Sequence, residues 1–72
     1  MDPARVWKTG EAVTITFGGV TVAGDVQLAS ANGRSLILRF EALLGGYAGT
    51  MPVLHEGGGF VDLLTHQPVE LA

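Results

Sequence analysis

The chain has 72 residues, of which 47% are apolar and 15% charged, with seven acidic side chains, four basic side chains and no cysteine. A single hydrophobic core is marginal at this length, and without cysteine neither disulfides nor thiolate metal sites can support it. The four basic residues are scattered along the chain, which argues against a phosphate-binding surface and disfavours nucleic acid as a partner.

No segment has the length and hydropathy of a signal peptide or of a bilayer-spanning helix, so we expect a cytoplasmic protein that does not enter a membrane. Residues 1–10 are interpreted as an N-terminal arm and residues 11–72 as one small β-barrel domain. The large apolar fraction and the few charges favour self-association or a protein partner, because such a short chain has little polar surface to cover its core.

The first strand is expected at residues 12–17, where apolar side chains alternate with threonines. The Gly18-Gly19 pair that follows predicts a two-residue hairpin turn, because glycine tolerates the positive φ angles of such turns. This turn sets Phe17 opposite Val20 and pairs apolar with apolar side chains further along.

The second strand is expected to continue from Val20 to Leu28, with Gly24 as a bend or bulge. It keeps Val20, Val22, Val26 and Leu28 on one face. The third strand carries its apolar residues chiefly at Leu36, Leu38 and Phe40.

Two registers are possible for the hairpin between these strands. A two-residue Asn32-Gly33 loop pairs Leu28 with Ile37, whereas a three-residue loop at residues 31–33 pairs Leu28 with Leu36. We prefer the second register because it places the apolar side chains of both strands on one face. Ile37 then points outward, where an apolar side chain needs something to cover it.

The remaining elements are short. Residues 42–46 are interpreted as a helical turn or a wide loop, because two leucines precede two glycines. Pro52 cannot donate a ladder hydrogen bond, so its strand is expected to lie at an edge or to have that side free. The expected ranges are a fourth strand at 47–54, a turn at 55–59, a fifth strand at 60–64, a turn or 3₁₀ turn at 65–68 and a sixth strand at 69–71.

Short strands separated by turn signals predict an all-β fold, a small antiparallel barrel of five or six strands. The meandering hairpins, the bent second strand and the turn before a short last strand make the chain similar in outline to SH3-like barrels. This resemblance is one of architecture, and such folds host many functions.

The sequence predicts no catalytic, cofactor or metal site. The serines lie in no nucleophile motif, and the absence of cysteine removes thiol chemistry, so we expect no enzyme. His55 and His66 each have a carboxylate nearby in the sequence, but their spacing matches no standard metal motif.

Part of the chain resembles the motifs by which PilZ domains bind cyclic di-GMP. Arg5 matches the first arginine of their Arg-x-x-x-Arg motif, although Thr9 stands in place of the second. Ser30-x-x-Gly33 matches the end of their second motif, although Leu28 replaces its acid or amide. The alternative hypothesis is therefore a small-ligand sensing domain for a nucleotide, with these ligand-binding candidates: Arg5, Ser30, Gly33 and Arg34.

The leading hypothesis from the sequence is a non-enzymatic protein-interaction or assembly module that forms a homo-oligomer. Aromatic residues and methionine are favoured at protein interfaces, although the same residues can close the ends of a small barrel. The partner-binding candidates are Trp7, Ile37, Tyr47, Met51 and Phe60.

Overall fold

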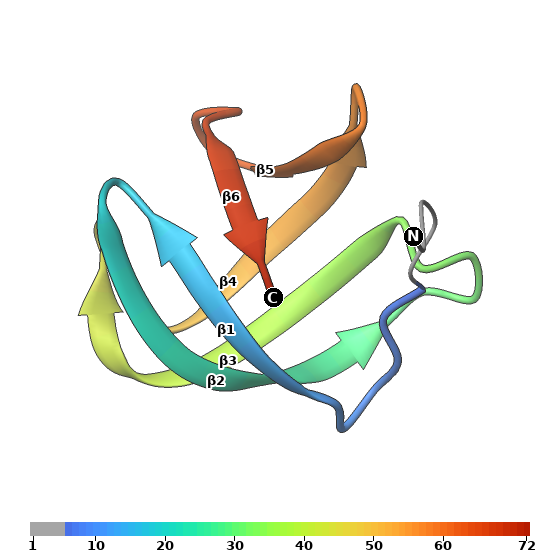
Figure 1. Ribbon diagram of the computed structural model, residues 1–72, viewed down its shortest axis with the longest axis horizontal. Helices are drawn as coiled ribbons and strands as arrows, with labels where there is room; N and C mark the ends of the chain where they lie inside the picture. The colour runs from blue at the N-terminus through green and yellow to red at the C-terminus, as the bar shows by residue number, and fades with distance from the viewer. Residues whose placement is uncertain (1–5) are drawn as a thin grey trace.

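The computed structural model describes residues 6–72, which form six strands and no helix (Figure 1). Each strand pairs antiparallel with the next and β6 pairs with β1, so the sheet closes into a barrel. This confirms the predicted small antiparallel barrel and is consistent with an SH3-like fold. The strands are β1 (Ala12–Phe17), β2 (Val20–Ala29), β3 (Ser35–Leu44), β4 (Tyr47–Glu56), β5 (Gly59–Asp62) and β6 (Pro68–Leu71).

The core fills the inside of the barrel with side chains that alternate along the strands. In β1 every second residue, beginning at Val13, is buried and the threonines between them face outward, as predicted from the period of two. The buried apolar residues are Trp7, Val13, Ile15, Phe17, Val26, Leu36, Leu38, Phe40, Leu44, Met51, Val53 and Val69.

Three hairpins use the same two-residue Gly-Gly turn, at Gly18-Gly19, Gly45-Gly46 and Gly57-Gly58. Both glycines of each pair have positive φ, between 56° and 91°, as turns that match the twist of the strands require. The prediction of a helical turn or wide loop at residues 42–46 was wrong. Leu44 is buried in the core as the last residue of β3 and pairs directly with Tyr47 across the turn.

The register between β2 and β3 combines the two that the sequence allowed. Near the turn Leu28 pairs with Ile37, and further along Val26 pairs with Leu38, with a bulge between Val26 and Leu28. The expectation that Leu28 shares the core face was therefore wrong: the bulge turns its side chain outward, and it is 56% exposed. Gly24, the expected bulge position, pairs regularly with Phe40.

Pro52 lies within β4, which is an inner strand of the closed barrel and not an edge. His55 donates its N–H to Arg34 beside β3, so the even-numbered residues of β4 turn their backbone groups to the other side, toward β5. Followed toward the N-terminus of β4, the β4–β5 ladder ends at Val53, one residue short of Pro52. The proline nitrogen therefore falls beyond the ladder, where no N–H is needed. The expectation that this side of the strand is free was wrong, because the Pro52 carbonyl accepts a hydrogen bond from the Leu63 N–H there.

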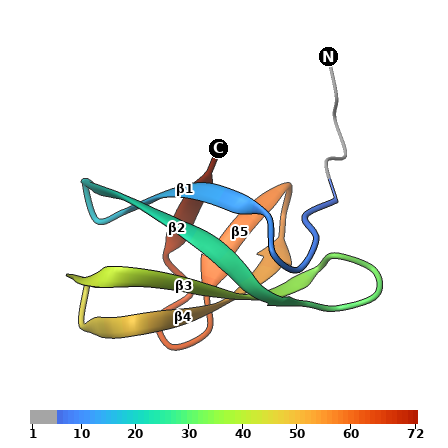
Figure 2. The same ribbon diagram turned by 90° about the horizontal axis from the view of Figure 1, so that it is seen from below.

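The segment before β1 packs against the barrel. Trp7 is buried in the core, Val6 contacts Gly33 in the β2–β3 turn, and the Gly10 N–H bonds to the carbonyl of Val26. Figure 2 shows this segment running beside the turn between β2 and β3. Within residues 6–72 there is no helix able to cross a membrane.

Candidate interaction surface

Three apolar side chains lie in a row on the outer face of the barrel. Leu28 of β2 pairs with Ile37 of β3, and Ile37 pairs with Pro52 of β4. The residues on either side of Ile37 in β3 are buried, so Ile37 itself points outward, as predicted. Directly paired residues share a face of the sheet, and the row therefore crosses three strands.

A groove of about 350 Å³ lies along this row. Leu63, which follows β5, forms its far wall and is 44% exposed. Its N–H bonds to the Pro52 carbonyl at 3.3 Å, which holds the wall against β4. We call this the outer groove, and its lining contains no charged side chain: Leu28, Ala29, Ser30, Ser35, Leu36, Ile37, Pro52 and Leu63.

Of the partner-binding candidates only Ile37 lies on this surface, although Ser30, a ligand-binding candidate, also lines the groove. The alternation in this strand places Ile37 on the face opposite to the core residues Leu36 and Leu38. The alternation in β2 predicts a core position for Leu28, whereas the bulge that turns it outward depends on the pairing with β3. Leu63 reaches the groove because the β4–β5 hairpin pairs Val53 with Asp62 and so places Leu63 beside Pro52, a register that depends on the Gly57-Gly58 turn.

The other partner-binding candidates from the sequence are spread over the barrel. Trp7 and Met51 are buried in the core and present no surface to a partner. Tyr47 is half-buried, stacks edge-on against Phe17 and donates a hydrogen bond from its hydroxyl to Asp62. Phe60 is half-buried beside the His55 ring.

The turn between β2 and β3, residues 30–35, is closed by hydrogen bonds among its own groups. The Ser30 hydroxyl donates to Asn32 Oδ1 at 2.8 Å and accepts the N–H of Ser35 at 3.1 Å. Asn32 Oδ1 also accepts the N–H of Arg34, and the Gly33 N–H bonds to the carbonyl of Ser30. These groups hold the turn closed, which is the ordinary role of serine and asparagine in such positions.

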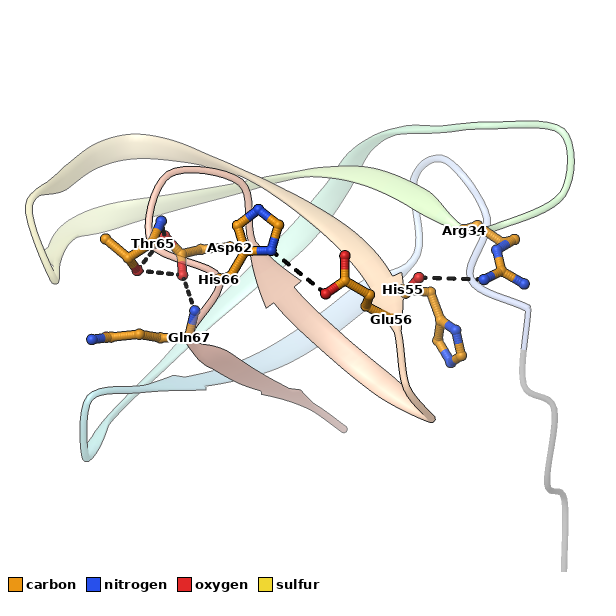
Figure 3. Close-up of polar contacts among 7 residues, drawn as sticks. All are labelled: Arg34, His55, Glu56, Asp62, Thr65, His66 and Gln67. Carbon is orange, nitrogen blue, oxygen red and sulfur yellow. Dashed lines mark hydrogen bonds and ion pairs between the residues drawn. The ribbon is translucent and has the colours of Figure 1, made fainter.

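The Arg34 guanidinium reaches the backbone oxygen of His55 at 3.5 Å (Figure 3). Gly33 is buried under Val6 and has a φ of 71°, so both its conformation and its lack of a side chain are needed. Arg5, the remaining ligand-binding candidate, lies outside the described residues.

A second polar feature is the buried carboxylate of Asp62, at the end of β5 (Figure 3). It accepts hydrogen bonds from the Tyr47 hydroxyl at 2.7 Å, the Thr65 hydroxyl at 2.7 Å, the Thr65 N–H at 3.0 Å and the Gln67 N–H at 2.8 Å. The carboxylate thereby shapes the turn that leads from β5 into β6, so β5 ends at Asp62 and not at residue 64.

Burial alone would raise the pKa of Asp62, but the hydrogen bonds from Thr65, Tyr47 and Gln67 outweigh it and hold this pKa well below its usual range. Burial, together with the hydrogen bond to Asp62 and its charge, raises the pKa of Tyr47. The pair is therefore held as an ionised carboxylate and a neutral phenol.

The two histidines have separate neighbours. His66 Nδ1 lies 3.5 Å from Glu56 Oε1 (Figure 3). His55 instead packs its ring edge-on against Phe60. Across residues 6–72 no group of three or more potential metal-ligating side chains of the His, Cys, Asp and Glu types comes together.

Comparisons of the chain with protein-family models, with curated proteins and with solved structures give no match.

Proposed function

We propose that this barrel is a non-enzymatic protein-interaction module that self-associates through the outer groove. The observation that carries the proposal is the uncharged row of Leu28, Ile37 and Pro52 across three strands, with Leu63 beside it. A contiguous apolar strip on the outside of a small barrel is a common mark of an interaction site.

A second copy fits this surface because the surface offers both a ridge and a hollow. Leu28 is 56% exposed at one side of the groove, and the hollow beside it is lined by apolar atoms. In a two-fold dimer the same patch meets itself, so Leu28 of each copy can enter the groove of the other. Ile37, in the middle of the row, then lies close to the two-fold axis.

The proposal is tested by light scattering and sedimentation of the full chain, from about 10 μM to about 1 mM, the range of weak interfaces. The measured mass is expected to rise toward that of a dimer with concentration. Leu28→Glu and Ile37→Glu are expected to keep the protein monomeric, because each places a charge in a desolvated apolar contact. Val20→Glu is the matched control, since Val20 is 50% exposed and does not line the groove.

Leu28→Glu is the more decisive variant because Leu28 is more exposed than Ile37 and its replacement disturbs the fold least. Circular dichroism of each variant checks that the barrel is intact. A wild-type protein that is monomeric at every concentration would refute self-association, and equal association of Leu28→Glu and wild type would remove the outer groove as its site.

A further inference from the structure

The hairpins β1–β2 and β3–β4 separate from one another toward their tips. The ladder between β2 and β3 ends at the pair Gly24 and Phe40. Beyond it, residues 20–23 pair only with β1, and the last residues of β3 find their partners in β4. Figure 2 shows the two hairpin ends diverging at the left of the view. A cleft of about 550 Å³ opens where they part.

Two strand edges adjoin this cleft, at Thr21 and Leu43, which are the chain neighbours of its lining residues Val22 and Ala42. Val20 closes the turn of β1–β2, so its backbone groups face β1, and those of Thr21 face the opposite side. By the same alternation the backbone groups of Leu44 face β4, and those of Leu43 face the opposite side, toward β2. Thr21 and Leu43 would pair if the β2–β3 ladder continued, but in the described part of the chain neither has a ladder partner on that side.

An unpaired strand edge is a template for an extended chain, because its N–H and carbonyl groups are spaced to bond with another strand. The edge supplies affinity through the backbone of the added strand, whatever its sequence. Selectivity must then come from the side chains that line the cleft.

The charges in the cleft favour a basic segment. Arg39 binds Asp25 with two hydrogen bonds, from Nε to Oδ1 at 3.2 Å and from Nη2 to Oδ2 at 3.0 Å, so these two residues neutralise each other. Glu41 also lines the cleft, is exposed, and forms no ion pair with any residue from 6 to 72. The cleft therefore holds one carboxylate that a Lys or Arg of a bound segment can pair with.

We infer that this cleft binds an extended, basic segment of another protein, which adds as a strand to the open edges at Thr21 and Leu43 and places a Lys or Arg beside Glu41. The site is separate from the outer groove, since the two share no lining residue. The barrel would thus hold a second copy on one surface and a peptide segment on another.

The probe is an acetylated and amidated peptide of sequence KVTVKVT, titrated into the ¹⁵N-labelled full chain up to about 1 mM. The amide signals of Thr21, Glu41 and Leu43 are expected to shift with saturation. Glu41→Gln is expected to weaken binding about threefold, as loss of an exposed ion pair does. Glu70→Gln, an exposed glutamate on β6 outside the cleft, is expected to bind as wild type.

Two further peptides separate strand addition from simple charge attraction. The sequence EVTVEVT is expected to bind more weakly than KVTVKVT. Two N-methylated versions of KVTVKVT are made, one methylated at the odd-numbered residues and one at the even-numbered residues. At least one of them is expected to lose binding, because each lacks the donors on one edge of the peptide. Shifts confined to the outer groove, no shift up to the highest concentration, or full binding by both N-methylated peptides would overturn the inference.

Because Leu28→Glu disrupts only the outer groove, it is expected to bind the peptide as wild type does. The two proposals can therefore fail independently of each other.

Discussion

Replacing Asp62 is expected to destabilise the barrel more than any other single polar substitution. The carboxylate is fully buried and accepts hydrogen bonds from Tyr47, Gln67 and both the backbone and the hydroxyl of Thr65. If each of the four lost hydrogen bonds costs about 1 kcal/mol net, Asp62→Ala lowers the free energy of unfolding by about 4 kcal/mol. A chain of this length has a total stability of about 4 to 11 kcal/mol, so the variant would keep about 0 to 7 kcal/mol of it.

Urea denaturation followed by circular dichroism measures this loss. Tyr47→Phe is the internal reference, because it removes one donor to the same carboxylate. It is expected to lower the free energy of unfolding by about 1 kcal/mol. An Asp62→Ala variant that loses no more stability than Tyr47→Phe would refute the claim that the carboxylate holds the turn between β5 and β6.

The pH dependence gives a second measurement on the same group. The folded state holds the pKa of Asp62 below its usual value of about 3.9, so the unfolded chain takes up a proton first as the pH falls. The stabilisation by the ionised carboxylate is therefore complete above about pH 5 and is lost progressively below about pH 4. The stability difference between wild type and Asp62→Asn should shrink in that acid range, and a difference that stays constant would contradict the assignment.

Two pairs of glycine substitutions test the packing, each by urea denaturation. Gly45→Ala and Gly18→Ala impose the same left-handed strain, with φ of 56° and 59°, but only at Gly45 does the added methyl overlap the Phe17 ring. Gly18→Ala is expected to cost about 1 kcal/mol and Gly45→Ala about 1 to 3 kcal/mol more, and equal losses would contradict the contact. Gly24→Ala places its methyl against a backbone oxygen of β3 and should cost at least about 2 kcal/mol, whereas Gly59→Ala meets open space and should cost less than about 0.5 kcal/mol. Similar values for this second pair would show that Gly24 is not needed for the close approach of β2 and β3.

Much of the fold follows from local pattern. The alternation at residues 12–17 places a strand with a buried face, and the Gly18-Gly19 pair places a turn whose strand register the structure reproduces. These features depend on residues that are neighbours in the chain, so single-sequence reasoning reaches them.

The register of β2 and β3 could be predicted only in part, because two demands compete there. The turn favours pairing Leu28 with Ile37, whereas the shared apolar face favours pairing Val26 with Leu38. The bulge between Val26 and Leu28 satisfies both. An extra residue in one strand is hard to foresee when each register is judged as a whole.

The role of Asp62 was missed for a different reason. A carboxylate followed three residues later by Thr65 is a local turn signal, and it could have been noticed. Its burial, however, depends on the Tyr47 hydroxyl, which comes from β4 and has no sequence pattern linking it to Asp62.

Self-association through the outer groove is tested most directly by the ¹⁵N–¹H spectrum of the unmodified chain, recorded at about 50 μM and at about 1 mM. Self-association through the groove predicts that the concentration-dependent shifts cluster at Leu28, Ser35, Ile37 and Leu63, and that they disappear in Leu28→Glu. Shifts that are absent, or that gather on another face of the barrel, would contradict the account.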